Sequence, residues 1–310
     1  MTQTGIVAVE QTASSAAGAA PAAMARRRAS GTNRYAVLRS VSRVGVYLLL
    51  AVGCLAYGAP LLWMISTSLK TPAAIMAQPP QWLPNPVVWR NYTEALTILP
   101  FNLFLRNTVF ITFWTMVGVA LSCTIVAYGF ARLSFRGRDF WFVVLLSTMM
   151  LPGQVTMIPV FMIFRALGWI NTFKPLIVPS FFGDAFFIFL LRQFYMTIPR
   201  ELDDAATVDG CGRFTILWRI HVHLMKPALA AVAVFSFING WNDFMGPLIY
   251  LTDMKMMTLA VGLNLFRGQY YSYMHYMMAA STATLMPVLA VFFIAQKYFI
   301  QGITLTGIKG

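Results

Sequence analysis

The acidic residues of this sequence are concentrated in one short polar stretch. Four of its ten Asp and Glu residues stand in ELDDAATVDG, at Glu201, Asp203, Asp204 and Asp209. Carboxylates are stabilised in the first turn of a helix by the positive end of the helix dipole, and Pro199 fits just before such a start. The stretch therefore predicts a short helix whose first turn carries negative charge.

The same stretch has the spacing of a docking surface. Leu202, Ala205, Ala206 and Asp209 follow i, i+3, i+4 and i+7 spacing and so share one helix face. Small residues on an exposed helix let a partner's backbone come close, and a helix laid in a groove is a recurrent docking mode. Gly210 then predicts the helix end, in a conformation with positive φ. A solvated helix that only connects two neighbouring segments fits the periodicity equally well.

A second set of residues interrupts long apolar segments with polar groups. Ionisable groups in a membrane span usually face the interior of the helix bundle or a water-filled path. Hydrogen bonding between helices is the alternative role for such residues. An indole ring among them offers a face on which a solute could stack. The candidate residues for a translocation path are Gln154, Asp184, Asn239, Trp241, Asn242 and Asp243.

Neither the histidines nor the cysteines predict a metal site or catalysis. His221 and His223 are two residues apart and point to different sides of a helix, no third ligand is nearby, and we expect both on the cytoplasmic surface. The sequence has no H-E-x-x-H motif and no G-x-x-x-x-G-K-[ST] phosphate loop. We therefore expect no metal, no cofactor and no ATP site in this chain, which is not predicted to be an enzyme. The cysteines, which show no metal spacing and predict no disulfide, are Cys54, Cys123 and Cys211.

The elements that must position these residues are membrane spans. The chain has 310 residues, of which 58% are hydrophobic and only 11% charged, whereas an average soluble domain is about 25% charged. A span needs roughly 20 apolar residues, and the gaps between charged residues delimit six such segments. We therefore predict an all-α membrane protein with six transmembrane helices. They lie near residues 44–67, 107–131, 141–164, 175–192, 227–250 and 277–299.

The distribution of positive charge predicts the orientation of these spans. With the N-terminus inside, 16 of the 23 Lys and Arg residues fall on the cytoplasmic side, in agreement with the positive-inside rule. Both termini and the acidic stretch are then cytoplasmic, and the net charge of +13 reflects topology rather than a nucleic-acid partner. We predict two regions, a disordered cytoplasmic tail over residues 1–40 and a six-span domain over residues 41–310.

Prolines predict two departures from regular helix. In MLPGQVTMIP, within the third span, Pro152 and Pro159 each remove a backbone donor. Such breaks persist in lipid where protein or water satisfies the freed carbonyls, so we expect this face inside the helix bundle. The loop after the first span has five prolines between Pro72 and Pro86, and it is predicted to be the longest external loop, with an extended or turning path.

Four strings of the sequence carry a family resemblance. They are MMLPGQVTMIPVF, FLLRQFYMTIPRELDDAATVDG, FSFINGWNDFMGPLIYL and IQGITLTGIKG. In this order they resemble the permease subunits of ABC importers, in the carbohydrate-uptake subfamily, and specifically the smaller permease of the maltose-type transporter. The resemblance covers roughly residues 45–310. Two departures stand out, because Asp203-Asp204-Ala205 replaces the family's Glu-Glu-Ala and His223 stands where the family usually has Pro.

The resemblance implies partners and a mechanism. Such permeases lie in a prokaryotic cell membrane and pair with a second homologous permease, two ATPase subunits that bind ATP and Mg²⁺, and an extracytoplasmic solute-binding protein. The acidic helix is implied to be a coupling helix that sits in a cleft of the ATPase and moves when ATP binds. The residues implied to couple are Glu201, Asp204, Ala205, Ala206, Asp209 and Gly210.

The predicted function is import of a sugar or an oligosaccharide, with ATP hydrolysed on a separate subunit. The alternative is a secondary transporter driven by an ion gradient. Such transporters usually show inverted repeats and intramembrane relays of ionisable residues. The sequence shows no repeat, and only Asp184 and Asp243 are acidic within the predicted spans. An intramembrane enzyme would need catalytic pairs inside the spans, which the motifs above do not supply.

Overall fold

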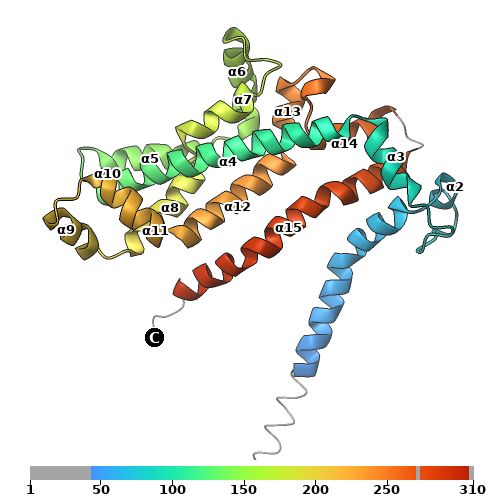
Figure 1. The fold of residues 1–310 in the computed structure, drawn as a ribbon, viewed down its shortest axis with the longest axis horizontal. Helices are drawn as coiled ribbons and strands as arrows, with labels where there is room; N and C mark the ends of the chain where they lie inside the picture. The colour runs from blue at the N-terminus through green and yellow to red at the C-terminus, as the bar shows by residue number, and fades with distance from the viewer. Residues whose placement is uncertain (1–42, 270–272, 307–310) are drawn as a thin grey trace, which may run out of the picture. The chain divides into compact units, whose positions relative to one another are not determined.

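The computed structural model describes residues 43–269 and 273–306. Its contacts divide the chain into two compact units, Met1–Trp63 and Met64–Gly310. The tail expected over residues 1–40 lies outside the described residues. Every regular element of the described residues is a helix (Figure 1), which confirms the all-α class.

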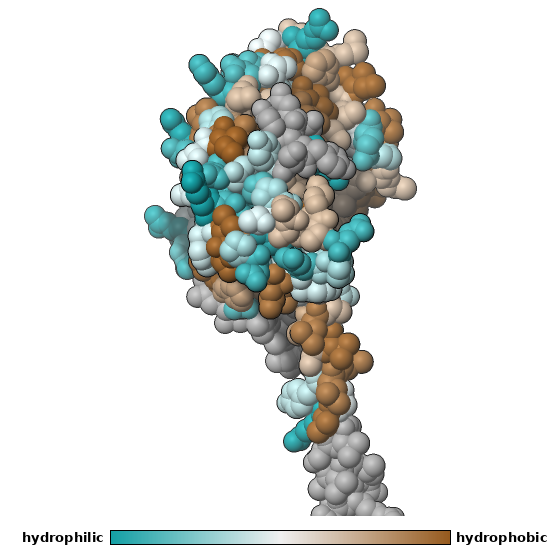
Figure 2. Space-filling model, turned by 90° about the vertical axis from the view of Figure 1, so that its right-hand side faces the viewer, coloured by the Kyte–Doolittle hydropathy of each residue, from teal (hydrophilic) through white to brown (hydrophobic). Residues whose placement is uncertain are grey.

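The first predicted span is a single helix, Arg43–Ser68, of 26 residues. Its most apolar window has no share buried inside the structure, and the helix presents mainly hydrophobic side chains (Figure 2). Leu49, for example, is 74% exposed. Contact between such side chains and water is unfavourable, whereas the hydrocarbon interior of a bilayer accommodates them.

The second unit combines long helices with short ones, and their labels follow Figure 1. Within the described residues, four helices of the chain are long and apolar enough to cross a membrane, or up to six if each bent pair counts as one span. The elements are α2 (Pro72–Ile75), α3 (Arg90–Ile98), α4 (Phe101–Arg132), α5 (Arg138–Thr148), α6 (Gly153–Ala166), α7 (Lys174–Ile177), η1 (Val178–Phe182), α8 (Ala185–Thr197), α9 (Glu201–Val208), α10 (Arg213–Thr215), η2 (Ile216–His221), α11 (Val222–Leu224), α12 (Lys226–Asn242), α13 (Met245–Tyr250), η3 (Met254–Met256), α14 (Leu259–Gln269) and α15 (Met274–Thr306).

Three further predicted spans coincide with helical segments of sufficient length. The predicted span 107–131 lies within α4, and the predicted span 277–299 lies within α15. The predicted span 175–192 falls within the segment Lys174–Thr197, which consists of α7, η1 and α8 with a break before α8. The sequence did not predict α14 as a separate helix, because Asn264 and Arg267 interrupt its apolar pattern.

The third and fifth predicted spans are bent or shortened. Helices α5 and α6 meet at 96° around Pro152, while Pro159 remains inside α6. Helix α12 ends at Asn242 rather than at residue 250, and it meets the preceding segment Arg213–Leu224 at 80°. The expectation that the proline-broken face lies inside the bundle is not met within this chain, because α6 has no buried residue.

Helix α4 organises the core of the second unit. One hydrophobic cluster joins α4 to α8 and α12 through residues such as Cys123, Leu191 and Val232. A second cluster joins the other end of α4 to α3, α14 and α15 through residues such as Phe104 and Phe266. In Figure 1, α4 runs beside α12, with α9 beyond one end and α3 beyond the other. The two ends of α4 therefore support two different sites.

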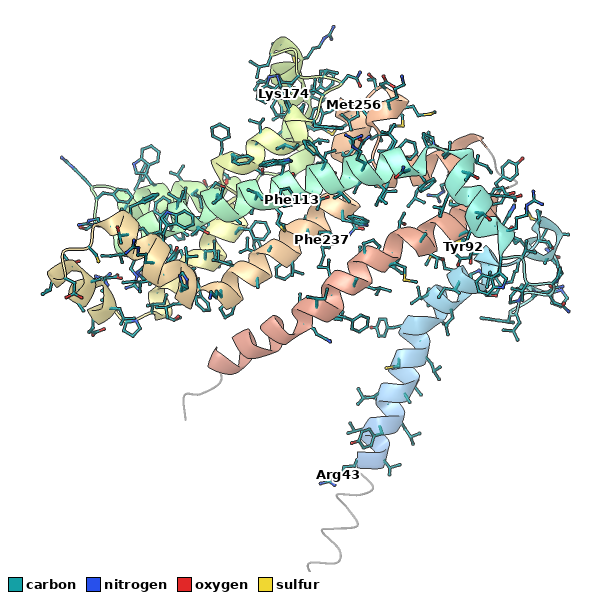
Figure 3. The ribbon with its side chains drawn as sticks, viewed as in Figure 1. Arg43, Tyr92, Phe113, Lys174, Phe237 and Met256 are labelled. Atoms are coloured by element: carbon teal, nitrogen blue, oxygen red, sulfur yellow. The ribbon has the colours of Figure 1, made fainter. Side chains whose placement is uncertain are left out.

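Two connections at one side of the second unit are fastened together by Asn171. Its backbone N–H donates to Tyr250 O at 2.8 Å, and its side-chain oxygen accepts from the backbone N–H groups of Thr252 and Asp253 at 3.2 and 3.0 Å. The neighbouring residues Lys174 and Met256 lie on this side in Figure 3. These bonds hold α13 in place after the end of α12.

Candidate functional sites

The acidic stretch forms α9, and its ends have the predicted form. Glu201, Asp203 and Asp204 occupy the first turn. At the other end Gly210 has φ +80°. The N–H of Cys211 donates to Ala206 O at 2.9 Å and the N–H of Gly210 donates to Thr207 O at 3.0 Å, which is the Schellman pattern. The prediction that Gly210 ends this helix at positive φ is therefore confirmed.

Helix α9 has an outward and an inward face, and they divide the predicted coupling residues. Val208 is 88% exposed, whereas Ala206 is 7% exposed and packs against the rest of the unit. Ala206 therefore does not lie on the surface that a partner of α9 could touch, contrary to the expectation from spacing alone. The predicted coupling residues that the structure leaves exposed are Glu201, Asp204, Ala205, Asp209 and Gly210.

The inward face of α9 is held by Asp203, which joins three parts of the fold. Its Oδ1 lies 2.5 Å from Nε2 of His221, and its Oδ2 lies 3.4 Å from a guanidinium nitrogen of Arg132. Arg132 is the last residue of α4 and its side chain is 4% exposed. His221 is fully buried, so its expected place on the surface is wrong, whereas His223 is exposed. We call Arg132, Asp203 and His221 the Asp203 cluster.

Aromatic rings and backbone carbonyls complete the surroundings of this cluster. The ring of His221 lies 5.4 Å, centroid to centroid, from both Tyr128 and Tyr195 in edge-on contacts. Arg132 also donates to the carbonyls of Tyr195 and Ile198 at 2.7 and 2.6 Å, at the end of α8. One guanidinium therefore holds both the end of α8 and the inward face of α9.

A polar cavity of about 540 Å³ lies near the other end of α4, between α4, α7, α12 and α13. Three predicted path residues line it, namely Asn239, Asn242 and Asp243. Sequence reasoning missed the threonines on its opposite wall. Thr108 and Thr115 are seven residues apart in α4, a helical spacing that could have placed them on one face. The further lining residues are Thr108, Ile111, Thr115, Leu176, Ile238, Gly240, Pro247 and Thr258.

Asp243 stands at the break between α12 and α13. Its Oδ1 accepts the N–H of Gly246 at 3.1 Å, so the carboxylate caps the first turn of α13. A Cβ on Gly246 would lie 2.6 Å from Oδ2 of Asp243, which means that only glycine lets the backbone approach this closely. The break in the helix therefore brings a carboxylate and the amide of Asn242 to the cavity wall.

The other three predicted path residues lie elsewhere. Trp241 is buried, its Nε1–H donates to Thr284 O at 3.2 Å, and its ring packs toward α15 rather than into the polar cavity. Asp184 is the N-cap of α8 and accepts from the N–H groups of Phe186 and Phe187 at 2.9 and 3.1 Å. Gln154 is exposed on α6. The structure thus brings together only half of the predicted path residues.

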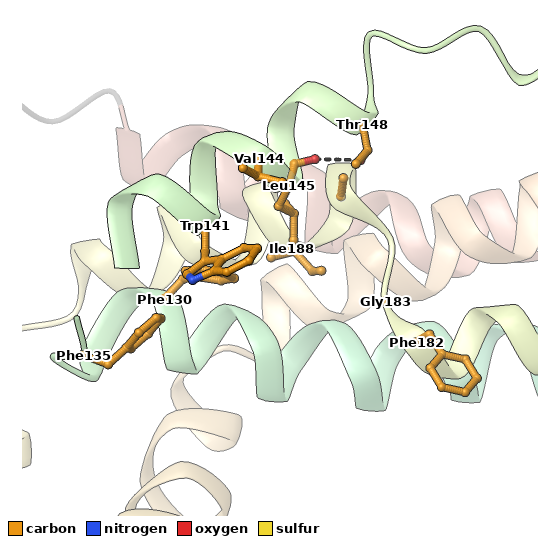
Figure 4. Close-up of a pocket in the computed structure, with 10 residues that line it drawn as sticks. Phe130, Phe135, Trp141, Val144, Leu145, Thr148, Phe182, Gly183 and Ile188 are labelled. Atoms are coloured by element: carbon orange, nitrogen blue, oxygen red, sulfur yellow. Dashed lines mark hydrogen bonds between the residues drawn. The ribbon is translucent and has the colours of Figure 1, made fainter. Parts of the chain in front are cut away.

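An apolar groove of about 440 Å³ lies beside α5 (Figure 4). It is lined by aromatic and aliphatic side chains such as Phe130, Trp141 and Ile188. Its polar side-chain groups are the indole N–H of Trp141 and the hydroxyl of Thr148, and this hydroxyl donates to the carbonyl of Leu145 at 2.6 Å. With no charged residue in its lining, this groove is a poorer candidate than the polar cavity for a hydrophilic solute.

Apolar helices around a polar cavity, with an exposed acidic helix at one end, define the architecture of a membrane transport subunit. A family model described as "Binding-protein-dependent transport system inner membrane component" matches residues 117–305. The chain belongs to this family.

Two curated relatives agree with this assignment. The chain is 33% identical over 275 residues to the arabinooligosaccharides transport system permease protein AraQ of Bacillus subtilis, covering 87% of this chain and 97% of that protein. It is 31% identical over 288 residues to the trehalose/maltose transport system permease protein MalG of Thermococcus litoralis, covering 89% and 99%.

A solved structure has the same fold. The crystal structure of a bacterial ABC transporter involved in the import of the acidic polysaccharide alginate superimposes with a TM-score of 0.74 at 26% identity, covering 84% of this chain and 96% of that chain. The protein is therefore an inner-membrane permease subunit of an ABC importer and not an enzyme in its own right. Membership of this family argues against the alternative of a secondary transporter driven by an ion gradient. It also implies an ATPase and a binding protein as partners.

Proposed function

We propose that this permease imports a sugar or an oligosaccharide, as one half of a path that it forms with a second, homologous permease. The observation that carries the proposal is the polar cavity, where Asn239, Asn242 and Asp243 face the threonines of α4. Sugar hydroxyls both donate and accept hydrogen bonds, and the amides and the carboxylate provide the matching groups. The hydroxyls of Thr108 and Thr115 donate within the fold, to the carbonyls of Phe104 and Leu176. The relatives named for arabinooligosaccharides and for trehalose and maltose point to the same class of solute.

The break at Asp243 explains how such a cavity can exist inside an apolar bundle. In lipid, backbone groups freed by a helix break need partners, and such breaks are tolerated where they line a cavity. Asn239 and Asn242 are exposed in this chain alone. In the assembled transporter we expect the second permease to cover them and to form the opposite wall of the path.

The proposed mechanism couples this path to ATP through α9. Two ATPase subunits bind ATP and Mg²⁺, and the exposed face of α9 sits in the cleft of one of them. An isolated helix of eight residues is marginal in water, so the order of α9 depends on its contacts. The Asp203 cluster supplies the contacts on the inward side, and the ATPase supplies those on the outward side.

The predicted external loop is proposed to receive the solute-binding protein. Its base is closed by Asn91, whose side-chain amide donates to the carbonyls of Ser68 and Lys70 at 2.8 and 2.9 Å. The hydroxyls of Ser68 and Tyr92 lie 2.8 Å apart at the same place. The loop is therefore anchored at both ends. This anchoring suits a docking surface that must keep a fixed position relative to the translocation path. With the loop on the outer face, both chain termini are proposed to be cytoplasmic. The complex is proposed to lie in a prokaryotic cell membrane.

Uptake by the reconstituted complex tests this function. The full permease, its partner permease, the ATPase and the binding protein are placed in liposomes with ATP inside, and labelled mono- and oligosaccharides are supplied outside. We expect ATP-dependent uptake of at least one saccharide, reduced by Asn242→Ala and unchanged by Asp184→Asn. Uptake of amino acids or inorganic ions in place of any saccharide would contradict the proposed solute class.

A further inference from the structure

We propose that Asp203 is a positioning residue that transmits the movement of α9 to α4 and to the segment that returns to the bundle. This inference rests on the proposed function, because it takes the outward face of α9 to be the face that docks on the ATPase. It assigns the inward face a different task. The outward face receives the movement, and the inward face passes it on through one carboxylate.

The first argument is where the partners of Asp203 come from. His221 belongs to η2, which leads into α12, and Arg132 ends α4. Both α4 and α12 contribute walls to the polar cavity. A displacement of α9 therefore acts on α4 directly through Arg132, and on α12 through η2 and α11. Networks of hydrogen bonds and salt bridges between elements that have two arrangements are one way in which distant sites are coupled.

The second argument is that one partner of Asp203, His221, is buried and depends on this carboxylate. The side chain of His221 is fully buried, and Nδ1 has no hydrogen-bond partner within the described part of the chain. Asp203 is thus the one hydrogen-bond partner that the described residues provide for this ring, and it pairs with Nε2. A buried polar group that loses its partner is costly, so the ring and the carboxylate tend to move together.

The third argument is the backbone around His221. Residues Ile216–His221 form a π-helical turn, and π-helical turns are frequent at functional sites. Four residues after His221, Met225 separates this segment from α12 at the bend of 80°. Asp203 therefore contacts the chain just before a bend, where a small displacement changes the direction of the following helix most easily.

The fourth argument is that Arg132 is attached both to the chain before α9 and to α9 itself. Its guanidinium bonds to the carbonyls of Tyr195 and Ile198 before α9 and to Asp203 within α9. Because both the entry to α9 and its inward face meet at one side chain, α9 and the end of α4 are expected to move as one body.

Neighbouring carboxylates provide the test, because Asp203 faces inward and Asp204 faces outward. Asp203→Ala, Asp203→Glu and Asp204→Asn are compared in the full transporter in liposomes, with Asp139→Asn, an exposed carboxylate on α5, as the matched control. Three quantities are measured for each: ATPase copurified per permease, ATP hydrolysis stimulated by the binding protein, and labelled saccharide imported per ATP hydrolysed.

We expect Asp203→Ala to keep the ATPase bound while saccharide imported per ATP falls at least about fivefold, the low end of typical coupling between sites. Asp203→Glu restores part of the ratio because it keeps the charge. Asp204→Asn lowers the amount of bound ATPase but leaves the ratio unchanged in the complex that remains. Asp139→Asn changes none of the three.

An unchanged ratio in assembled Asp203→Ala complex would overturn the inference. If Asp203→Ala prevents assembly, the same ratio is measured for Asp203→Asn instead. This variant keeps an oxygen to accept from His221 but loses the negative charge that faces Arg132. Assembled Asp203→Asn complex with a normal ratio would reduce Asp203 to a structural role, whereas a lowered ratio supports the inference. If instead Asp204→Asn and other outward changes leave ATPase binding intact, the docking role of α9 in the proposed function fails, independently of Asp203.

Discussion

Asp203 and Asp243 are two carboxylates of one chain that are held in opposite ways. Asp203 meets side chains from two other elements, His221 of η2 and Arg132 of α4. Asp243 accepts from the backbone N–H of Gly246, three residues away, and faces a cavity. The first carboxylate joins separate elements, whereas the second shapes one local break.

This difference teaches what each site can do. Side-chain partners from different elements make a carboxylate sensitive to the relative movement of those elements. Backbone partners from the same turn hold a carboxylate in place whatever the other helices do, so it can meet a solute at a fixed position. We therefore assign movement to the α9 end of the second unit and solute contact to the cavity at the other end of α4.

Removal of the guanidinium at the α9 end has the largest expected effect. Arg132→Ala leaves the partly buried carboxylate of Asp203 with His221 alone, and it removes the donor of the carbonyls of Tyr195 and Ile198. Loss of one partner of a buried pair costs roughly 3–5 kcal/mol, and the partial exposure of Asp203 places the expected cost at the low end of this range. We expect little assembled complex, measured by size-exclusion chromatography in detergent. Arg138→Ala is the control, because its pair with the exposed neighbour Asp139 contributes about 0–1 kcal/mol. Equal yields for the two variants would contradict the assigned role of the Asp203 cluster.

A change of charge at the cavity end should affect transport without affecting assembly. Asp243→Asn keeps an oxygen that accepts from Gly246, so α13 stays capped, but the negative charge at the cavity wall is lost. We expect uptake per assembled complex to fall about tenfold, which corresponds to roughly 1.4 kcal/mol. Asp184→Asn makes the same change at the N-cap of α8, away from the cavity, and should leave uptake unchanged. If both variants transport equally well, Asp243 is only a cap.

The turn after α9 tests whether the local fold of this helix matters for coupling. Gly210 has φ +80°, and a side chain in this conformation costs roughly 1–2 kcal/mol. A Cβ there would meet nothing within 4 Å in this chain, so the strain comes from the backbone alone. We expect Gly210→Val to weaken ATPase binding, and Gly210→Asn to weaken it less because Asn tolerates this region. Pull-down of the ATPase measures the binding of both variants. Equal binding would contradict the claim that backbone strain at positive φ weakens the docking of α9.

The smallest effect is expected for Trp241, which sequence reasoning placed with the path residues. Trp241→Phe removes the hydrogen bond to Thr284 O, a loss of about 1 kcal/mol or less. The unfolding temperature of the purified permease should decrease slightly while uptake and saccharide preference stay the same. A changed preference among saccharides would show that Trp241 contacts the transported solute after all.

The sequence predicts those features that depend on neighbours in the chain. The apolar segments, the start of α9 and the positive φ of Gly210 follow from local chemistry, and the structure confirms them. His221 could not be placed in this way, because its burial depends on Asp203, 18 residues earlier, and on rings from α4 and α8. The prolines predicted a break near Pro152. They did not predict the angle between α5 and α6, because this angle depends on packing.

Periodicity also has limits within a single helix. Trp241 and Asn242 are adjacent, yet successive helical residues differ in direction by about 100°. Only Asn242 reaches the polar cavity, and Trp241 packs toward α15. Ala205 and Ala206 show the same effect in α9, where one is exposed and the other is buried. The spacing of small residues indicated a docking helix, but the contacts of the fold decide which of its faces is available.

Crosslinking of α9 to the ATPase tests the central claim most directly, namely that its outward face docks while its inward face stays on the bundle. One cysteine is introduced at Ala205, Ala206 or Val208, opposite a cysteine in the ATPase cleft. Cys54 and Cys211 of the chain are replaced by Ser, and the buried Cys123 is kept. The account predicts crosslinks from Ala205→Cys and Val208→Cys with a yield that changes when ATP is added, and little from the buried Ala206→Cys. Crosslinking from Ala206→Cys alone, or from none of the three, would contradict it.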